Sequence, residues 1–237
     1  MNRYEEIIAL RQELKRPGVF RHNHIQMRMV LWHVTIRSSV FFKRFMDIIL
    51  SILAIIIGTP IFLLTAFLVK ATSPGPIIFS QVRVGKFGRH FKFYKFRSMY
   101  IDAEARKAEL MKHNESKDGV IFKMKHDPRI TPVGRFIRKF SIDELPQLFN
   151  VLLGDMSLVG PRPPLPSEVK TYTLEERKRL NTLPGITCLW QVSGRSELPF
   201  SKQIALDKEY IASRSMWKDF IILLKTIPAI LTGKGAW

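Results

Sequence analysis

Two adjacent carboxylates, Asp143 and Glu144, stand among residue types that suit phosphate chemistry, with Arg138 shortly before them. Where such a pair begins a helix, it lies beside free backbone amides, and these amides together with the helix dipole bind phosphate. The same spacing fits a structural interpretation, because Ser141 and Glu144 form the Ser-x-x-Glu pattern of a capping box. Asp143 followed by Pro146 also fits a helix N-cap. Spacing alone leaves these interpretations open.

Further polar and turn-forming segments accompany this pair. Arg162 lies between Pro161 and Pro163, which stiffen the backbone and hold the side chain in one direction. Its guanidinium fork matches the geometry of a phosphate. For the other arginines, a solvated basic face is the alternative. The segments are Lys95–Met99, Asp127–Thr131, Gly134-Arg135, Gly160–Pro163 and Trp190–Arg195.

The composition limits the partners and chemistry of the chain. Its formal net charge of +18 favours polyanionic partners, which are nucleic acid, anionic lipid or phosphorylated substrates. The single cysteine, Cys188, excludes an intrachain disulfide and a thiolate metal cluster. The sequence lacks the Gly-x-x-x-x-Gly-Lys, Gly-x-Gly-x-x-Gly, His-Glu-x-x-His and Gly-x-Ser-x-Gly motifs, so these catalytic signatures do not assign its chemistry.

A charge-free stretch, Ile48–Val69, predicts a membrane segment, because a helix of its length would extend roughly 33 Å, enough to cross a bilayer. Thr59 and Pro60 lie at its middle, where proline removes one backbone hydrogen bond and the Thr59 hydroxyl is expected to donate to a carbonyl freed by Pro60. Basic residues flank both ends and favour the cytoplasmic side. We therefore predict a helix-break-helix hairpin that enters the bilayer and returns; the alternative is a kinked helix that spans it. The flanking residues are Arg37, Lys43 and Arg44 before the stretch, and Lys70, Arg83, Lys86 and Arg89 after it.

The remaining pattern predicts a mixed, helix-rich α/β domain. The last helix carries Trp217 among apolar and basic residues, which fits a helix in the membrane interface and equally a core helix. Short strands are predicted at residues 77–81 and 89–97, and helices at 103–113, 143–153, 174–180 and 216–231. We divide the chain into a basic arm at 1–40 with a helix at 4–15, a membrane hairpin at 41–75 and a catalytic domain at 76–237.

The run from Phe42 to Ala236 resembles the bacterial sugar transferases known as monotopic phosphoglycosyl transferases, or polyprenyl-phosphate hexose-1-phosphate transferases. The resemblance covers roughly four-fifths of the chain through many ordered segments, which makes it far more specific than any single motif. The matching residues are Lys43–Asp47, Pro60, Ser73–Pro76, Lys95–Met99, Asp127–Thr131, Asp143–Gln147, Gly154–Pro163, Pro184–Arg195, Asp207, Tyr210 and Gly235-Ala236. Cys188 stands where a glycine is usual and Thr59 where a serine is usual, and neither departure touches the carboxylate pair.

The resemblance implies roles for particular residues. It makes Asp143 the nucleophile and Glu144 the ligand of a catalytic Mg²⁺, with Ser141 and Glu144 supporting the turn as caps. It implies a re-entrant hairpin broken at Thr59 and Pro60, a catalytic domain on the cytoplasmic face of the bacterial inner membrane, and interfacial helices. The phosphate and nucleotide site would be lined by Lys95, Arg97, Arg138, Arg162 and Arg195, with Pro161 and Pro163 placing the turn near the uridine.

The implied reaction moves a sugar-1-phosphate from a UDP-sugar to polyprenyl (undecaprenyl) phosphate with release of UMP, as the first membrane step of exopolysaccharide or glycan assembly. A free aspartate titrates near pH 4, so an aspartate nucleophile needs no base, but it must approach a negatively charged diphosphate. Magnesium and arginines relieve that repulsion. The resulting acyl phosphate passes its group to the lipid phosphate. The expected partners are the two substrates, an anionic membrane, and a second copy of the chain or downstream glycosyltransferases, with no nucleic acid.

Two rival functions remain at this stage. A membrane-tethered module for polyanions would use the basic face, with aromatic residues of the second strand as stacking groups, and would leave the carboxylate pair unexplained. Those aromatic residues are Phe91, Phe93, Tyr94 and Phe96. A non-catalytic scaffold for glycan assembly would keep the fold and lose the reaction, which the intact pair argues against.

Overall fold

The structure, a computed structural model, describes residues 19–115, 124, 126–233 and 235. The chain divides into two compact units, Met1–Met46 and Asp47–Trp237. The predicted helix at 4–15 lies outside the described residues, and our boundaries at residues 40 and 75 stay predictions.

Helix α2, Val19–Thr72, contains Pro60, and its part from Asp47 onward, which belongs to the second unit, has a continuous packing face. The residues of this face recur every three or four positions, which places them on one side of a helix. The face continues across Pro60, so both halves of this segment pack against the same domain. Its buried members are Asp47, Ser51, Thr65 and Val69, with half-buried Ile55, Gly58 and Phe62 between them.

The opposite face of this helix is apolar and exposed. Ile57 is 77% exposed and Phe67 is 68% exposed, with Ile52, Ile56 and Leu63 also open. Among the residues that the structure describes, the segment Ser38–Thr72 is the one helical stretch long and apolar enough to cross a membrane.

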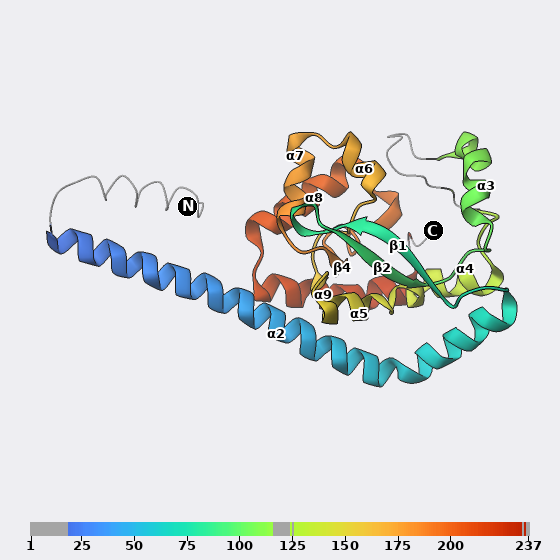
Figure 1. Ribbon diagram of the computed structural model, residues 1–237, viewed down its shortest axis with the longest axis horizontal. Coiled ribbons are helices and arrows are strands. Elements are labelled where there is room, and N and C mark those ends of the chain that lie inside the picture. Colours follow the sequence, from blue (N-terminus) through green and yellow to red (C-terminus); the bar gives the residue numbers. More distant parts are fainter. Residues whose placement is uncertain (1–18, 116–123, 125, 234, 236–237) are drawn as a thin grey trace. The chain divides into compact units, whose positions relative to one another are not determined.

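The predicted break at Pro60 is a bend within a continuous helix. Figure 1 shows α2 changing direction where its colour passes from cyan to teal. The Thr59 hydroxyl donates to the carbonyl of Ile55 at 2.8 Å. A proline at position 60 deprives the carbonyl of Ile56 of its donor, because helical bonds join residues four apart. The hydroxyl therefore satisfies the carbonyl one residue earlier than the one that we predicted.

Strands β1, Ile78–Val84, and β2, His90–Phe96, form an antiparallel hairpin around the short 3₁₀ turn η1, Lys86–Gly88. This confirms both predicted strands, and β1 extends three residues beyond its predicted end at Gln81. Sequence reasoning missed a parallel pair, β3 (Ser157–Val159) and β4 (Gly185–Thr187), because three-residue strands show no readable alternation. This pair requires glycine: a Cβ on Gly185 would lie 2.0 Å from the backbone nitrogen of Gly160.

Short helices surround these strands. The predicted helix at 143–153 divides at Pro146, which lacks the amide hydrogen that a continuous helix needs there. The predicted segments at 103–113 and 174–180 each consist of an α-helix followed by a 3₁₀ turn. The elements are α3 (Ala103–Leu110), η2 (Met111–His113), α4 (Pro132–Lys139), η3 (Ile142–Glu144), α5 (Gln147–Leu153), α6 (Pro166–Thr171), α7 (Leu174–Arg177), η4 (Lys178–Asn181), η5 (Arg195–Glu197), α8 (Phe200–Ser213) and α9 (Met216–Thr232).

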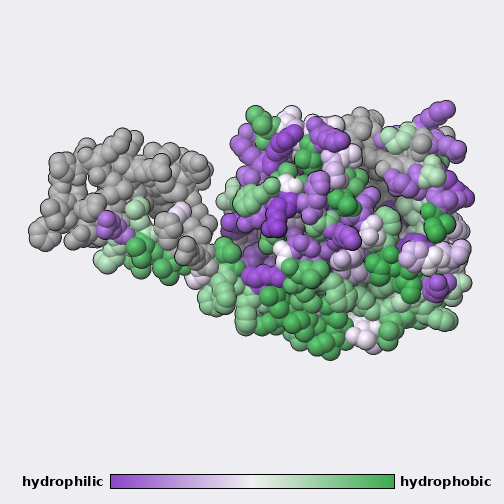
Figure 2. Space-filling model, in the orientation of Figure 1, coloured by the Kyte–Doolittle hydropathy of each residue, from purple (hydrophilic) through white to green (hydrophobic). Residues whose placement is uncertain are grey.

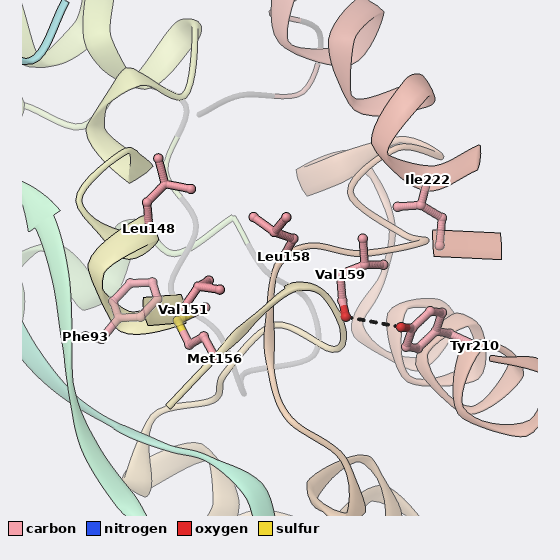
Figure 3. Close-up of a cluster of buried hydrophobic side chains, with 8 residues drawn as sticks. All are labelled: Phe93, Leu148, Val151, Met156, Leu158, Val159, Tyr210 and Ile222. Atoms are coloured by element: carbon pink, nitrogen blue, oxygen red, sulfur yellow. Dashed lines mark hydrogen bonds between the residues drawn. The ribbon is translucent and has the colours of Figure 1, made fainter. Parts of the chain in front are cut away.

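The main core joins the hairpin, α5, β3 and the two C-terminal helices (Figure 3). Tyr210 of α8 donates its hydroxyl to the carbonyl of Val159 at 3.1 Å and to Asp219 of α9 at 2.7 Å. These two contacts of one hydroxyl join α8 to β3 and to α9. The buried members are Phe93, Leu148, Val151, Met156, Leu158, Val159, Tyr210 and Ile222.

Helix α9 has one buried face and one exposed apolar face, so it combines features of both predicted alternatives. Asp219 and Ile222 are buried, whereas Trp217 is 70% exposed. Figure 2 shows apolar residues gathered along the lower edge of the second unit, where Figure 1 draws α2, α5 and α9. The exposed residues of α9 are Met216, Trp217, Phe220, Leu224, Ile227 and Leu231.

Candidate active site

The two carboxylates converge on one lysine. Lys95 Nζ lies 3.2 Å from Asp143 Oδ2 and 2.8 Å from Glu144 Oε1. Arg162 Nη1 donates to the same oxygen of Glu144 at 3.0 Å. Asp143 is 5% exposed. Two anions and two cations thus meet in a largely buried cluster, although they come from three separate parts of the sequence.

A strained turn presents the carboxylates. Ser141 has φ of 54° and ψ of 21°, a left-handed conformation that is costly for a residue with a Cβ. Its side chain caps no amide, and the Glu144 side chain binds Lys95 and Arg162, so the predicted capping box is wrong. Asp143 lies inside η3 and Pro146 is the N-cap of α5, so the alternative cap is wrong too.

Asn150 of α5 positions the strand that carries Lys95. Its Oδ1 accepts from the backbone nitrogen of Tyr94 at 3.0 Å, and its Nδ2 donates to the carbonyl of Lys92 at 2.6 Å. Asn150 is fully buried, so these bonds form away from water. They tie β2 to the helix that directly follows the carboxylate turn.

Three consecutive carbonyls fix the turn that carries Arg162. Arg179 Nη2 donates to the carbonyl of Arg162 at 3.1 Å, and Arg83 Nη1 donates to that of Pro163 at 3.1 Å. The backbone nitrogen of Val84 donates to the carbonyl of Pro164 at 3.0 Å. Pro161 and Pro163 are both buried. The turn is therefore held by hydrogen bonds from both η4 and β1, which supports a fixed direction for the Arg162 side chain.

Arg179 is itself held by a buried network. Its Nη2 lies 2.6 Å from Asp207 Oδ2, and its Nη1 donates to the Tyr172 hydroxyl at 2.9 Å. The exposed fraction of the side chain is 6% for Arg179 and 1% for Asp207. Burial raises the pKa of Tyr172 to about 12 in spite of the neighbouring Arg179 charge, so its hydroxyl stays neutral.

Burial and the charges of this cluster shift the pKa values of neighbouring side chains. Burial alone would raise the pKa of Glu144, but the Lys95 and Arg162 charges and their hydrogen bonds prevail and hold that pKa well below its usual range. Burial and the nearby Arg162 charge lower the pKa of Arg83 to about 10. Because its pKa is lowered, Glu144 is ionised at neutral pH.

Arg195 approaches the carboxylate turn from another element. Its Nη2 lies 3.4 Å from Ser141 Oγ, and its backbone has a positive φ of 52°. Its Nη1 is buried and has no hydrogen-bond partner among the residues that the structure describes. An unpaired buried donor of this kind is costly, and an anion would satisfy it.

Two predicted site residues lie apart from the carboxylate contacts. The Arg97 guanidinium donates to the Ser73 carbonyl, the Ser73 hydroxyl and the Pro74 carbonyl, each at 2.7 Å. These contacts favour a structural role at the end of α2 over the phosphate-binding role that we predicted. Arg138 is half-buried in α4, and its carbonyl accepts from the backbone nitrogen of Ser141 at 3.0 Å.

Of the four aromatic residues of β2 that the rival polyanion-binding function would use for stacking, two are buried, and Phe91 and Tyr94 are half-buried. Phe93 is 1% exposed and Phe96 is 3% exposed, and both lie in the apolar core. Phe62 of α2 packs edge-on against Phe96, with ring centroids 5.7 Å apart. These rings serve the packing of the domain.

Sequence reasoning missed the residues that position the site. It read Arg83 only as a basic flank of the membrane segment, and it gave no role to Asn150 or Arg179. Their partners lie 80, 56 and 17 positions away in the sequence. An asparagine inside an otherwise apolar helix is the signal that could have drawn attention to Asn150, whereas Arg83 and Arg179 lie among other polar residues and give no such signal.

Comparison with known proteins identifies a family and several relatives of the chain. A family model described as "Bacterial sugar transferase" matches residues 38–233. The chain is 49% identical over 202 residues to "Galactosyl transferase CpsE" of Streptococcus agalactiae, covering 84% of this chain and 44% of that protein. It is 42% identical over 225 residues to "Undecaprenyl-phosphate galactose phosphotransferase" of Salmonella typhimurium, covering 92% and 46%.

A shorter relative is covered almost entirely. The chain is 39% identical over 198 residues to "Exopolysaccharide production protein ExoY" of Sinorhizobium fredii, covering 82% of this chain and 88% of that protein. The chain thus spans less than half the length of the first two relatives and most of the third.

Proposed function

The chain belongs to the bacterial sugar transferase family, and we propose that it transfers a sugar-1-phosphate from a UDP-sugar to polyprenyl phosphate, releasing UMP. The observation that carries this proposal is the meeting of Asp143 and Glu144 with Lys95 and Arg162. A carboxylate nucleophile and fixed cations are what phosphoryl transfer between two anionic substrates requires. The names of the Salmonella and Sinorhizobium relatives support undecaprenyl phosphate as the acceptor and exopolysaccharide assembly as the pathway.

The proposed reaction has two displacements at one phosphorus atom. In the first, an oxygen of Asp143 attacks the phosphorus that bears the sugar, and the bond from that phosphorus to UMP breaks, so UMP leaves with the electron pair. This forms an acyl phosphate on Asp143. In the second, an oxygen of the lipid phosphate attacks the same phosphorus and the Asp143 carboxylate is released. No proton needs to be taken from either nucleophile, because both are anionic.

The cations around the carboxylates suit this sequence. Lys95 lies beside Asp143, where it can lower the repulsion between the carboxylate and the incoming diphosphate. Arg162, held by its turn, presents a planar fork that matches phosphate oxygens. Because these groups are fixed before substrate binds, little reorganisation is needed in the transition state.

The carboxylate oxygens of the site fit a Mg²⁺ ion whose remaining ligands come from the substrate phosphates and water. Among the described residues no cluster of three or more His, Cys, Asp or Glu side chains is found, and the site offers two adjacent carboxylates. Mg²⁺ is commonly held by one or two carboxylates together with substrate phosphates and water. Glu144, with Asp143 beside it, would hold the ion, which when bound neutralises charge on the diphosphate.

The packing of α2 supports a re-entrant arrangement. The Asp47 carboxylate accepts from the backbone nitrogen of Leu158 at 3.3 Å. At the other end of the segment, Ser73 is held by Arg97, and Val69 packs against Phe96. Both ends are therefore attached to one domain, which cannot lie on two sides of a bilayer. We infer that the segment bends back in the membrane and that the domain lies on the cytoplasmic face.

The exposed apolar residues extend this surface beyond α2. Phe136 of α4 is 57% exposed, Leu153 of α5 is 68% exposed, and Trp217 of α9 is 70% exposed. An amphipathic helix with such a face lies in the membrane interface. We therefore assign α9 as an interfacial helix, which keeps the site at the depth of a lipid phosphate. The net charge of +18 favours an anionic membrane.

A turnover assay tests the proposed reaction. Purified protein in nanodiscs is given a panel of UDP-sugars with Mg²⁺ and undecaprenyl phosphate, and UMP release is measured. The panel also identifies the sugar. No UMP from any UDP-sugar would overturn the proposal, and salt-sensitive polyanion binding without turnover would favour the rival function.

The covalent step is tested separately. A UDP-sugar labelled in the sugar-bearing phosphate should leave label on the wild-type protein without acceptor, and none on Asp143→Asn. The matched control, Asp102→Asn in an exposed ion pair, should label normally. Sequential kinetics without a labelled protein would reject the intermediate.

A further inference from the structure

A cavity of about 170 Å³ opens beside Glu144 and is not used by the chemistry described above. We propose that it holds the isoprene unit next to the phosphate of the lipid acceptor, with Arg195 binding that phosphate. The inference rests on the proposed function and assigns a place to one of its two substrates.

The walls of the cavity match a short branched hydrocarbon. Most of its lining is aliphatic and comes from four elements, which are α2, α5, β4 and α9. At about 30 Å³ for a water-sized group, the volume admits roughly five such groups, close to one five-carbon isoprene unit. The apolar lining residues that matter are Ala54, Leu148, Ile186, Ala229 and Ile230.

The polar end of the cavity suits an anion. Ser141, Glu144 and Arg195 all line it. Lys95 and Arg162 both bind Glu144, whereas the hydrogen bond of Arg195 goes to Ser141 Oγ. The buried Nη1 of Arg195 has no partner within the described part of the chain, so it can donate to a phosphate oxygen.

The position of the cavity favours the lipid over the nucleotide. Ala54 belongs to the membrane segment, and Ala229 and Ile230 belong to α9, whose outer face is exposed and apolar. Thr187, Gln191 and Thr226 also line the cavity, but the two threonine hydroxyls bond each other at 2.8 Å and Gln191 Oε1 accepts from Cys188 Sγ at 3.1 Å. The polar groups of a uracil or ribose would therefore find few free partners there. A lipid entering between α2 and α9 would reach the carboxylates with its phosphate first and leave the rest of its chain in the bilayer.

The two half-reactions allow binding of the acceptor to be tested separately from binding of the donor. The first, formation of the labelled phosphosugar enzyme with release of one UMP, uses only the donor. Filling the cavity with Ala229→Phe should raise the KM for undecaprenyl phosphate by about tenfold or more, because the isoprene unit loses its buried contact. The rate of the first half-reaction should stay within about twofold. Ala212→Phe, on an exposed position of α8, is the matched control and should change neither.

A small probe tests the ligand chemistry directly. Dimethylallyl phosphate carries one isoprene unit, and methyl phosphate carries none. The wild type should use dimethylallyl phosphate about tenfold better as acceptor, and Ala229→Phe should abolish that preference. Ala54→Phe, at an exposed lining position on α2, is a second variant that should give the same result, and it replaces Ala229→Phe if that variant does not fold. Arg195→Gln should lower the use of dimethylallyl phosphate and of methyl phosphate as acceptors by about the same factor.

The outcomes distinguish this inference from the function on which it rests. Equal loss in both half-reactions of the cavity variants would assign the cavity to the donor and overturn the inference. An unchanged KM for undecaprenyl phosphate in both variants would overturn it as well. Failure of the wild type to release UMP from any UDP-sugar would instead overturn the proposed function.

Discussion

The guanidinium of Arg179 donates a hydrogen bond of 3.1 Å to the backbone carbonyl of Arg162. Because Arg179 is also paired with the buried Asp207, this bond ties the site turn to the interior of the domain. Arg83 holds the next carbonyl, that of Pro163. The direction of the Arg162 side chain is thus set by Arg83 and Arg179, whose hydrogen bonds go to the turn rather than to Asp143 or Glu144.

Arg179→Lys should lower the rate of the first half-reaction by about tenfold with little change in the KM for the donor. Lysine keeps the charge opposite Asp207 but lacks the fork that reaches Tyr172 and Arg162 together. Rapid-quench kinetics of phosphosugar formation measures the effect. Arg106→Lys, in an exposed ion pair on α3, should leave the rate unchanged. An Arg179→Lys variant that folds and reacts at the wild-type rate would show that the turn does not depend on this bond.

Lys95→Met should bind Mg²⁺ about tenfold more tightly in the absence of substrate while turnover falls by about a hundredfold. The Lys95 ammonium contacts the two carboxylates that would hold the ion, so the two cations would compete. Mn²⁺ titration followed by electron paramagnetic resonance measures the affinity. Lys92→Met, an exposed lysine of the same strand, is the control. Weaker metal binding in Lys95→Met would place the ion elsewhere.

The free energy of unfolding should depend on pH through the ionisation of Glu144. Its pKa is lowered in the folded protein, so the stabilisation is present above its ordinary value of 4.5 and is lost as the pH falls through the lowered value. Arg162→Met removes one positive charge beside Glu144, so the pKa of Glu144 rises and the stabilisation should be lost at a higher pH. The midpoint of acid unfolding measures the shift, with Arg106→Met as control. An unchanged midpoint in Arg162→Met would contradict the coupling.

Asn150→Ala should lower the free energy of unfolding by about 2–4 kcal/mol, because it leaves the Tyr94 amide and the Lys92 carbonyl without partners. Urea denaturation in detergent followed by fluorescence measures the loss. Asn181→Ala, at an exposed position, should cost less than about 0.5 kcal/mol. Equal effects of the two substitutions would show that Asn150 does not hold β2 to α5.

Leu224→Cys labelled with an environment-sensitive fluorophore should shift its emission to the blue when the protein is placed in anionic vesicles. Leu224 lies on the exposed face of α9, which is assigned to the membrane interface. Leu174, at the start of α7, is 84% exposed, and Figure 1 draws α7 on the other side of the domain from α9. A label on Leu174→Cys should therefore report water. The native Cys188 is buried and gives a low background. The same emission from both labels would contradict the interfacial assignment.

The sequence by itself was sufficient for the elements whose signal is local. The charge-free stretch around Pro60, the alternating hairpin strands and the apolar periodicity of α9 each depend on neighbouring residues, and all three were predicted. The family followed from ordered motifs, and the resemblance singled out the pair Asp143-Glu144. Local patterns failed where strands were too short to alternate, as in β3 and β4.

Only the tertiary structure decided which residues meet. Capping and a phosphate site both fit the spacing around Asp143, and the structure rules out the capping box because the Glu144 side chain instead binds Lys95 and Arg162, which come from distant segments. The roles of Arg97 and Arg179 likewise depended on partners far along the chain. A spacing rule describes residues that share one helix or strand, whereas long-range pairs form because packing buries polar groups that must then find partners.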